Sequence, residues 1–504
     1  MARTRKKNKK RITYYLKPSN LSAEIKSYGA EITIKRALLL YATYIGVISG
    51  IGYLLKMKPW AIGIVDVCSL IFIPILIVNT YKNAYEQRRF SDISQYMQHI
   101  LYGFRGSGKI KTALESVQVL FKENSFMYEL IEKALTEMDS PNTEGDPTRE
   151  ALKIIEKEYS CERLRTIHKF LIKVEQLGGT YEQTIDLLLD DREFWVDRVS
   201  LLQANKKKKK REVTVSIIVS LLLAFLMNLL MPKDIDITAS LLYQIGAIIM
   251  MLFDLFVYVA ADRKLATDWI SQKEIISENT TMKNYEFILN YDEKKERKTS
   301  FKFLVIPAIL VVIGIITKWI PLFVVAGILI PVMLFQHKLN YKISMKELKE
   351  EINLKFPRWL MEITMILQST KNVQEAIFQS IDTAPIVLVP ELNKFRAALR
   401  EDPTSPKPYY NFMKDFDLPE VSASMNMFYS LSQGNSDDEQ RQIAEIISRN
   451  HKLLDRAEQE ADENSLAMLY LDFLLPQLSV GLMVMVDMVL YIMMFMPTMA
   501  TWVK

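Results

Sequence analysis

One uninterrupted helical pattern constrains this chain more than any other feature. After the glycine turn Gly178-Gly179-Thr180, the pattern runs from Tyr181 to Met231 without a proline or a glycine. A helix of that length measures about 75 Å at ~1.5 Å per residue, which is more than twice the ~30 Å hydrocarbon core of a membrane. The charged first part must therefore lie in water, and the apolar last part, from Val213 onward, in lipid.

The composition of the whole chain agrees with this division. Of its 504 residues, 49% are hydrophobic and 24% are charged, a mixture typical of membrane helices joined to water-exposed regions. Cys68 and Cys161 lie in segments of different kinds, so we expect no disulfide. The four histidines show no metal-ligand spacing, and no catalytic set of residues emerges. We therefore predict no enzymatic activity, no cofactor and no metal site.

Apolar runs predict seven membrane spans and two soluble regions, both helical in pattern. The first two spans form a hairpin around Lys56 to Pro59, and the fifth and sixth are short and flanked by proline. The predicted divisions are a basic arm (1–36), a first hairpin (37–78), a first soluble region (79–212), the third and fourth spans (213–261), a charged linker (262–302), a second hairpin (303–335), a second soluble region (336–467) and a C-terminal span (468–504).

Basic residues set the predicted orientation of these spans. They crowd the N-terminal arm, the run Lys206 to Arg211 and the stretch Lys338 to Lys349, whereas the loops on the other side are short and carry few of them. Positive charge stays on the cytoplasmic side, so we expect a multi-pass protein of the cell membrane with both soluble regions in the cytoplasm and the C-terminus outside. Beside a membrane span, the arm is better explained as an anchor than as a nucleic-acid ligand, and no nucleic-acid partner is expected.

Both soluble regions repeat apolar residues at helical spacing, and neither shows the alternation of a strand. In the first region the apolar positions are Ile93, Met97, Ile100, Leu101 and Phe104. Residues three and four apart share one helix face, so each region is expected to fold as a compact helical bundle. The predicted fold class is an all-α membrane protein with about seven transmembrane helices and two duplicated helical bundles.

Short matches recur at a nearly constant offset and indicate an internal duplication. Ile73 to Leu76 resembles Ile330 to Met333, and Lys109 to Val117 resembles Lys371 to Ile381. Gly178 to Ile185 likewise resembles Gly434 to Ile443, and Met231-Pro232 resembles Met496-Pro497. Each unit then has two spans, a bundle and one span, so it starts inside and ends outside. A second parallel unit requires one extra span to bring the chain back, which is the predicted role of the fourth. The last helix is expected to break at Pro476.

Two glycine-containing motifs have a plain structural interpretation. Gly103 to Lys109 has the glycine and lysine spacing of a phosphate-binding loop, but Ile110 follows where Mg²⁺ binding needs Ser or Thr, and a helical pattern precedes it. We interpret it as a corner between two helices. Gly178, Gly179 and Thr180 are the candidate structural turn, in which the glycines end one helix and Thr180 caps the next.

Polar residues at or within the spans form the remaining candidate sites. A candidate membrane-surface basic patch consists of Lys206, Lys207, Lys208, Lys209, Lys210 and Arg211. We expect these side chains to reach anionic lipid headgroups, and the more specific alternative is direct contact with a partner protein. Asp66, Asp254 and Asp487 lie within spans. We favour helix packing over ion or proton conduction for these acids, each bonded to a polar neighbour such as Tyr258 or Tyr491, because no polar pathway accompanies them.

The chain resembles a known family, the type II secretion system F domain proteins. The resemblance rests on Glu175 to Leu189, followed by the basic run and the third span, and on the helix pair Ile93 to Val117. In the second half it rests on Phe356 to Ile381 and Tyr429 to Ile447, where Gln433-Gly434-Asn435 replaces the glycine pair. It covers roughly 86–232 and 340–497.

The resemblance implies a function as well as a fold. Proteins of this family form the membrane platform of type II secretion, type IV pilus, tight-adherence (Tad) pilus and archaellum machines. It implies contact with a cytoplasmic secretion or pilus ATPase and with pilin-like subunits, and a homodimer. An archaellum platform is the closest alternative. A membrane transporter that uses the intramembrane aspartates is a further one.

Overall fold

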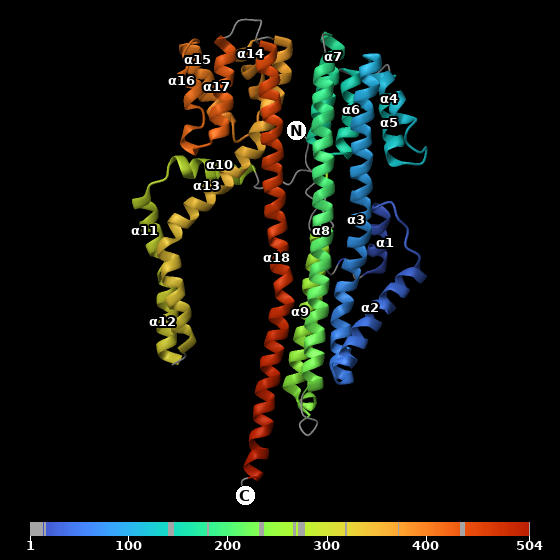
Figure 1. Ribbon diagram of the computed structural model, residues 1–504, viewed down its shortest axis with the longest axis vertical. Helices are drawn as coiled ribbons and strands as arrows, with labels where there is room; N and C mark the ends of the chain where they lie inside the picture. Colours follow the sequence, from blue (N-terminus) through green and yellow to red (C-terminus); the bar gives the residue numbers. More distant parts are fainter. Residues whose placement is uncertain are drawn as a thin grey trace. The chain divides into compact units, whose positions relative to one another are not determined.

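The computed structural model describes residues 14, 17–139, 146–178, 181–230, 236–265, 269–270, 278–317, 320–370, 372–433 and 439–502. Every regular element in these residues is a helix, and no strand occurs among them (Figure 1). The predicted all-α fold class is confirmed for this part of the chain.

Among the residues that the structure describes, five helices are long and apolar enough to cross a membrane, as expected of a membrane protein. They correspond to the first, second, third, fourth and last predicted spans. They are α2 (Ile34–Leu54), α3 (Pro59–Ser107), α8 (Glu182–Leu230), α9 (Leu241–Leu265) and α18 (Glu439–Trp502).

The predicted fifth and sixth spans are helical but do not belong to this group of five. The fifth corresponds to α12 (Val305–Thr317), which has 13 residues, and the sixth to the beginning of α13 (Ile320–Thr370). At ~1.5 Å per residue, α12 alone is about 20 Å long and falls short of the hydrocarbon core. The total of seven spans therefore remains a prediction.

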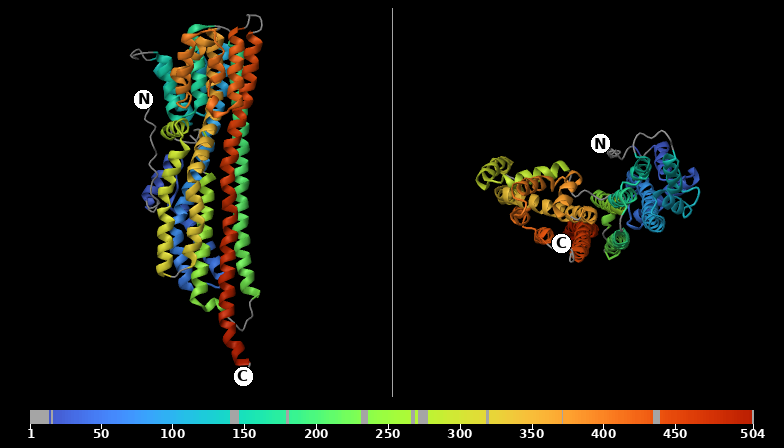
Figure 2. Two further views of the ribbon diagram at one scale, coloured as in Figure 1. Left: turned by 90° about the vertical axis from the view of Figure 1, so that its left-hand side faces the viewer. Right: turned by 90° about the horizontal axis from the view of Figure 1, so that it is seen from above.

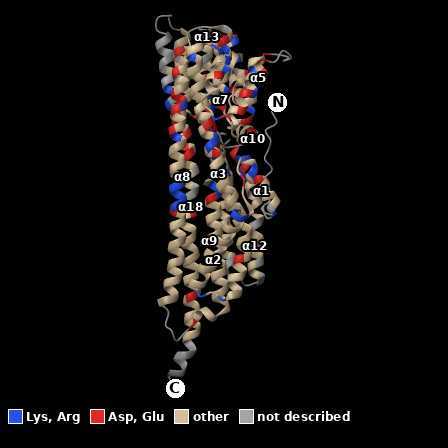
Figure 3. Ribbon diagram, turned by 90° about the vertical axis from the view of Figure 1, so that its right-hand side faces the viewer, with Lys and Arg blue, Asp and Glu red and all other residues tan. Residues whose placement is uncertain are grey.

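The longest helices are continuous. α8 has 49 residues, so the unbroken helix predicted from the sequence is confirmed. Its charged residues lie on the part nearer its beginning, and the apolar remainder carries none (Figure 3). α18 has 64 residues and passes through Pro476, so the predicted break there is wrong. A proline removes one backbone donor, and neighbouring groups compensate in a membrane helix.

The chain forms two compact units, which share α18. The first comprises Met1–Glu175, Ile185–Gln272 and Asp462–Lys504. The second comprises Gln176–Thr184 and Lys273–Ala461.

The first unit contains a bundle built on the second half of α3 and the beginning of α8. All five apolar residues predicted for its core on α3 are completely buried, which confirms the helical spacing. Helix α1 (Pro18–Ser27) packs Leu21 and Ile25 against Ile73 and Ile77 of α3. The 3₁₀ turn η2 (Ile237–Ala239) precedes α9. The other bundle helices are α4 (Ile110–Gln118), α5 (Phe126–Met138), α6 (Pro147–Glu158) and α7 (Glu162–Leu177).

The second unit has its own aromatic-rich core. Trp359 of α13 is 1% exposed, and its indole N–H donates to the hydroxyl of Ser380 at 2.9 Å, which satisfies the one polar atom of a buried ring. The surrounding elements are α10 (Glu278–Leu289), α11 (Glu293–Phe303), α14 (Val373–Ser380), η3 (Ile381–Thr383), α15 (Val389–Glu401), α16 (Lys407–Asn411), η4 (Lys414–Phe416) and α17 (Pro419–Gln433).

Glycines form the two corners that were singled out in the sequence. The corner expected in Gly103 to Lys109 lies at its end, since Gly108 has φ +65° directly after α3 and Lys109 precedes α4, while Gly103 itself is part of α3. A Cβ atom on Gly103 would lie 2.6 Å from the Ser116 hydroxyl, so a glycine is needed for the close packing of α3 on α4. Gly178 has φ +70° after α7, as expected of a glycine that ends a helix. Gly179 and Thr180 lie outside the described residues.

Candidate functional site

The basic run on α8 divides into two faces. Lys206 is 3% exposed, and its ammonium lies 4.8 Å from the ring centroid of Trp269. Lys209 pairs with Glu212 at 2.7 Å, and Lys210 pairs with Asp262 of α9. Lys207, Lys208 and Arg211 are exposed. Contact with lipid headgroups therefore stays a prediction for the exposed three, while the other three bind within the protein.

Asp262 is the centre of a polar cluster that joins three helices. The carboxylate is 6% exposed, pairs with Lys210 of α8 and accepts a hydrogen bond from the Asn79 amide of α3 at 3.1 Å. The Lys210 ammonium also lies 5.5 Å from the ring centroid of Tyr258. A buried carboxylate is costly unless a charge and hydrogen bonds compensate it, and here both are present.

The part of α18 around Asp472 is bonded to α8 and α9, close to Asp262 along the axis of α9. Lys264 pairs with Asp472 at 2.7 Å, and the Ser216 hydroxyl donates to the carbonyl oxygen of Phe473 at 2.8 Å. Figure 2 shows α18 running beside α8 over this part. We call the contacts around Asp262 and Asp472 the boundary cluster, because they lie where the charged part of α8 gives way to its apolar part.

Two of the predicted intramembrane acids join helices, as the packing interpretation expected. Asp66 of α3 accepts a hydrogen bond from Ser49 of α2 at 2.8 Å. Asp254 of α9 accepts from Ser479 of α18 at 2.7 Å and from Ser220 of α8 at 3.2 Å. The expected partner Tyr258 is not used. These serines on other helices take its place.

Asp487 differs from the other two acids. It is 1% exposed, and no hydrogen bond to its side chain occurs among the residues that the structure describes, so the expected bond from Tyr491 is not formed. Its Oδ1 atom is buried without a hydrogen-bond partner.

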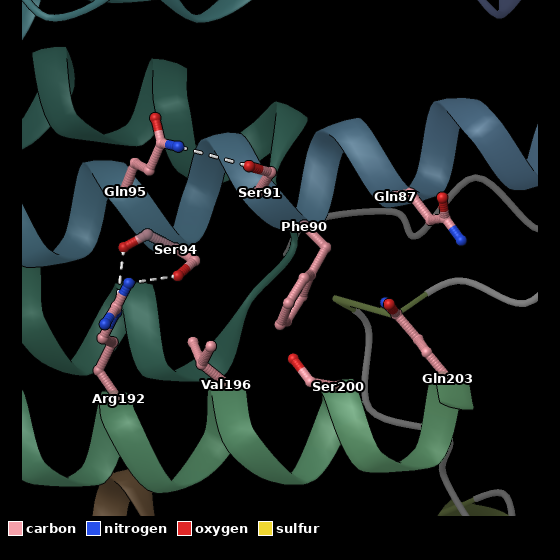
Figure 4. A pocket seen from close by; sticks show the side chains of 9 residues that line it. All are labelled: Gln87, Phe90, Ser91, Ser94, Gln95, Arg192, Val196, Ser200 and Gln203. Atoms are coloured by element: carbon pink, nitrogen blue, oxygen red, sulfur yellow. Dashed lines mark hydrogen bonds between the residues drawn. The ribbon is translucent and has the colours of Figure 1, made fainter. Parts of the chain in front are cut away.

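A polar groove of about 410 Å³ lies between α3 and α8 in the first unit (Figure 4). Arg192 donates to both the carbonyl and the hydroxyl oxygen of Ser94, at 3.2 and 2.7 Å, so the guanidinium is engaged within the protein. The lining contains no Asp, Glu, His, Cys or Lys, and therefore offers neither a general base nor a metal ligand. It consists of Gln87, Phe90, Ser91, Ser94, Gln95, Arg192, Val196, Ser200 and Gln203.

A buried polar chain crosses the first bundle, and no sequence motif predicts it. His168 of α7 is completely buried, with Nε2 3.0 Å from the hydroxyl of Tyr96 and Nδ1 2.9 Å from a carboxylate oxygen of Glu156. Cys161 nearby in sequence is also buried, and burial raises the pKa of its thiol, so the neutral form dominates at neutral pH. The spacing of the histidines along the chain fits no metal site, and such spacing cannot reveal a partner on another helix.

No protein-family model, curated protein or solved structure matches this chain. Among the described residues, no group of three or more His, Cys, Asp or Glu side chains could hold a metal ion. A functional proposal must therefore rest on the helices that join the bundle to the membrane and on the contacts that hold them together.

Proposed function

We propose that this chain is an integral membrane platform of a type II secretion or type IV (Tad-like) pilus assembly machine. In this role it is not an enzyme. It couples a cytoplasmic ATPase to the insertion of pilin-like subunits into a filament. The proposal combines the sequence resemblance with one feature of the structure, the continuous helices that run from bundle to membrane.

Those continuous helices are the observation that carries the proposal. α3 and α8 both pass from the first bundle into an apolar stretch without a break, with 49 residues each. A helix transmits displacement along its axis only if its neighbours move with it. Contacts of the boundary cluster, including Lys210 with Asp262 and Lys264 with Asp472, join α8, α9 and α18 in this way. Motion of the bundle would therefore reach the membrane.

The order of helices supports the proposed duplication. The helices from α2 to α8 comprise an apolar helix, a long helix, four shorter helices and a long final helix, and the series from α12 to α18 has the same order. The two long second helices have 49 and 51 residues, and the long final helices have 49 and 64. We propose two parallel copies with α9 as the connecting span, seven spans in total, both bundles in the cytoplasm and the C-terminus outside.

The proposed partners follow from this arrangement. The bundles offer surfaces to a cytoplasmic ATPase, and the membrane helices offer surfaces to pilin-like subunits and to a second copy of the chain. The exposed Lys207, Lys208 and Arg211 suit anionic lipid headgroups at the boundary.

Deletion and co-purification test the proposal together. Loss of the gene should abolish filament assembly or secretion, and the full chain, purified in mild detergent, should retain a hexameric secretion ATPase. As a control, a variant that reverses the exposed charges of Lys207 and Lys208 should still insert and fold. A deletion strain that keeps normal filaments and secretion would contradict the proposal.

An archaellum platform is the second candidate, since the same architecture serves that filament, and loss of swimming filaments on deletion would favour it. A transporter is less well supported, because Asp66 and Asp254 are engaged in bonds between helices. Flux that Asp66→Asn, Asp254→Asn and Asp487→Asn abolish in reconstituted vesicles, while assembly persists, would favour the transporter.

A further inference from the structure

Asn228 near the end of α8 has an amide whose orientation is fixed by its neighbours. The hydroxyl of Tyr243 donates to the carbonyl oxygen of Leu55 at 2.6 Å, so its own proton is committed. It therefore accepts from the Asn228 Nδ2 atom, 2.5 Å away. Exchanging the amide nitrogen and oxygen of Asn228 would leave two acceptors facing each other. The Oδ1 atom is thus the one that remains buried without a partner.

Asp487 supplies a second unpartnered oxygen near the same tyrosine. Tyr243 belongs to one buried cluster with Met483 and Leu490 of α18, which lie about one helical turn before and after Asp487. α9 and α18 pack closely one turn away, since a Cβ atom on Gly246 would lie 3.0 Å from the Met483 sulfur. Asn228 and Asp487 are 7% and 1% exposed. Two oxygens, on two helices that pack against Tyr243, are therefore buried and without hydrogen-bond donors.

The chemistry of these atoms limits what can bind there. Nothing as large as a side chain of another protein can reach oxygens that are almost completely buried, so the ligand must be small. An ionised carboxylate in an apolar interior requires a compensating positive charge. One carboxylate balances one unit of charge, and carboxylate and amide oxygens are hard donors that suit alkali and alkaline-earth cations.

We propose that Asp487 and Asn228, on two helices that pack against Tyr243, form a binding site for a single monovalent cation such as Na⁺. The bound ion would join α18 to α8 and the beginning of α9, at the end of these helices opposite the boundary cluster. Asp66 and Asp254 differ because at least one serine hydroxyl already donates to each carboxylate, although Oδ1 of Asp66 has no partner.

Thermal unfolding of the full chain, purified in detergent, tests the site with Na⁺ as the probe. The melting temperature should rise with the NaCl concentration and then level off, and it should be higher in NaCl than in choline chloride at equal ionic strength. The reason is that a ligand that binds only the folded state stabilises that state. Asp487→Asn should lose this Na⁺-specific rise. Asn228→Leu should raise the half-saturating Na⁺ concentration roughly tenfold or more, as loss of a group around a metal does. The matched control Asp66→Asn should keep the wild-type response.

A direct measurement covers the case in which Asp487→Asn fails to fold. Equilibrium dialysis with radioactive sodium should give one Na⁺ per chain for the wild type and weaker binding for Asn228→Leu. Equal effects of Na⁺ and choline on the wild type, an unchanged Na⁺ response in Asp487→Asn, or stability that follows pH alone would overturn the proposal. None of these measurements depends on filament assembly or secretion. The cation site can therefore be refuted while the platform function holds, and the platform function can be refuted while the cation site holds.

Discussion

Replacing Lys210 by methionine should destabilise the protein far more than the same change at the neighbouring Lys207. Lys210→Met removes the positive charge that compensates Asp262, whose side chain is 7% exposed. Asn79 would then be left as a neutral donor at 3.1 Å. Lys207 is exposed, and its replacement removes no such contact.

The magnitude follows from the burial of the pair. Removing one partner of a buried pair leaves an uncompensated charge and costs about 3–5 kcal/mol. The Lys210 side chain is 27% exposed, so some water can reach the site, and the remaining Asn79 bond stabilises part of the charge. We therefore expect a loss of about 2–3 kcal/mol in the free energy of unfolding, at or below the lower end of the range for a buried pair. For Lys207→Met we expect a change within about 0.5 kcal/mol.

The double variant Lys210→Met with Asp262→Asn separates the buried charge from the shape of the site. It removes both charges while keeping an amide that can bond Asn79, so it should be more stable than Lys210→Met alone. Unfolding in detergent, followed by circular dichroism, gives the free energies for the four members of this cycle. Equal losses for Lys210→Met and Lys207→Met, or strictly additive losses in the double variant, would refute the reasoning.

Three further changes test the first bundle and the loop before α9. Gly103→Val should cost about 1–3 kcal/mol of stability, because the Cβ would lie 2.6 Å from the Ser116 hydroxyl oxygen, and thermal unfolding would measure it. Tyr96→Phe should also cost about 1–3 kcal/mol, since it leaves a buried His168 nitrogen without its partner, and urea titration would detect the loss. The bond from the Thr238 hydroxyl lowers the pKa of Asp236, so this group stabilises the fold at neutral pH. Asp236→Ala should lower the melting temperature at pH 7, and the difference should shrink as the pH falls through the pKa of Asp236.

Each of these changes has a control on the same kind of residue. Gly106 has open space around its Cβ position, so Gly106→Val should cost less than Gly103→Val, and the reverse order would contradict the packing argument. Tyr102 is 48% exposed, and Tyr102→Phe should be nearly neutral. If Tyr96→Phe were equally neutral, the buried chain would not contribute to stability. Asp190 is exposed, and Asp190→Ala should show no comparable dependence on pH. A constant effect of Asp236→Ala from pH 7 to acid would argue against the linkage.

The helices themselves were predictable because their signals are local. Apolar spacing identified the buried face of α3, and the absence of proline and glycine identified α8 as one helix. The contacts between helices were not predictable in the same way. The partner of Asp262 on α3 is 183 positions away, and the partner of Lys264 on α18 is 208 positions away. Such pairs depend on the rotation and depth of each helix, which a local pattern does not contain. The break expected at Pro476 was wrong because a proline removes only one backbone donor, which a long membrane helix tolerates.

The contacts on α18 are spread along its axis, and this spread bears on how the helix can move. Asp472 binds Lys264, the carbonyl of Phe473 accepts from Ser216, and Ser479 donates to Asp254. These three positions extend over about two helical turns, so a slide of α18 by one turn, ~5.4 Å, would break all three at once. The alternative is movement of α8, α9 and this part of α18 as one body, which keeps every bond. If only apolar contacts held the helices together, movement as one body would not be favoured over sliding. These polar contacts therefore favour rigid transmission over sliding, as the proposed platform function would need.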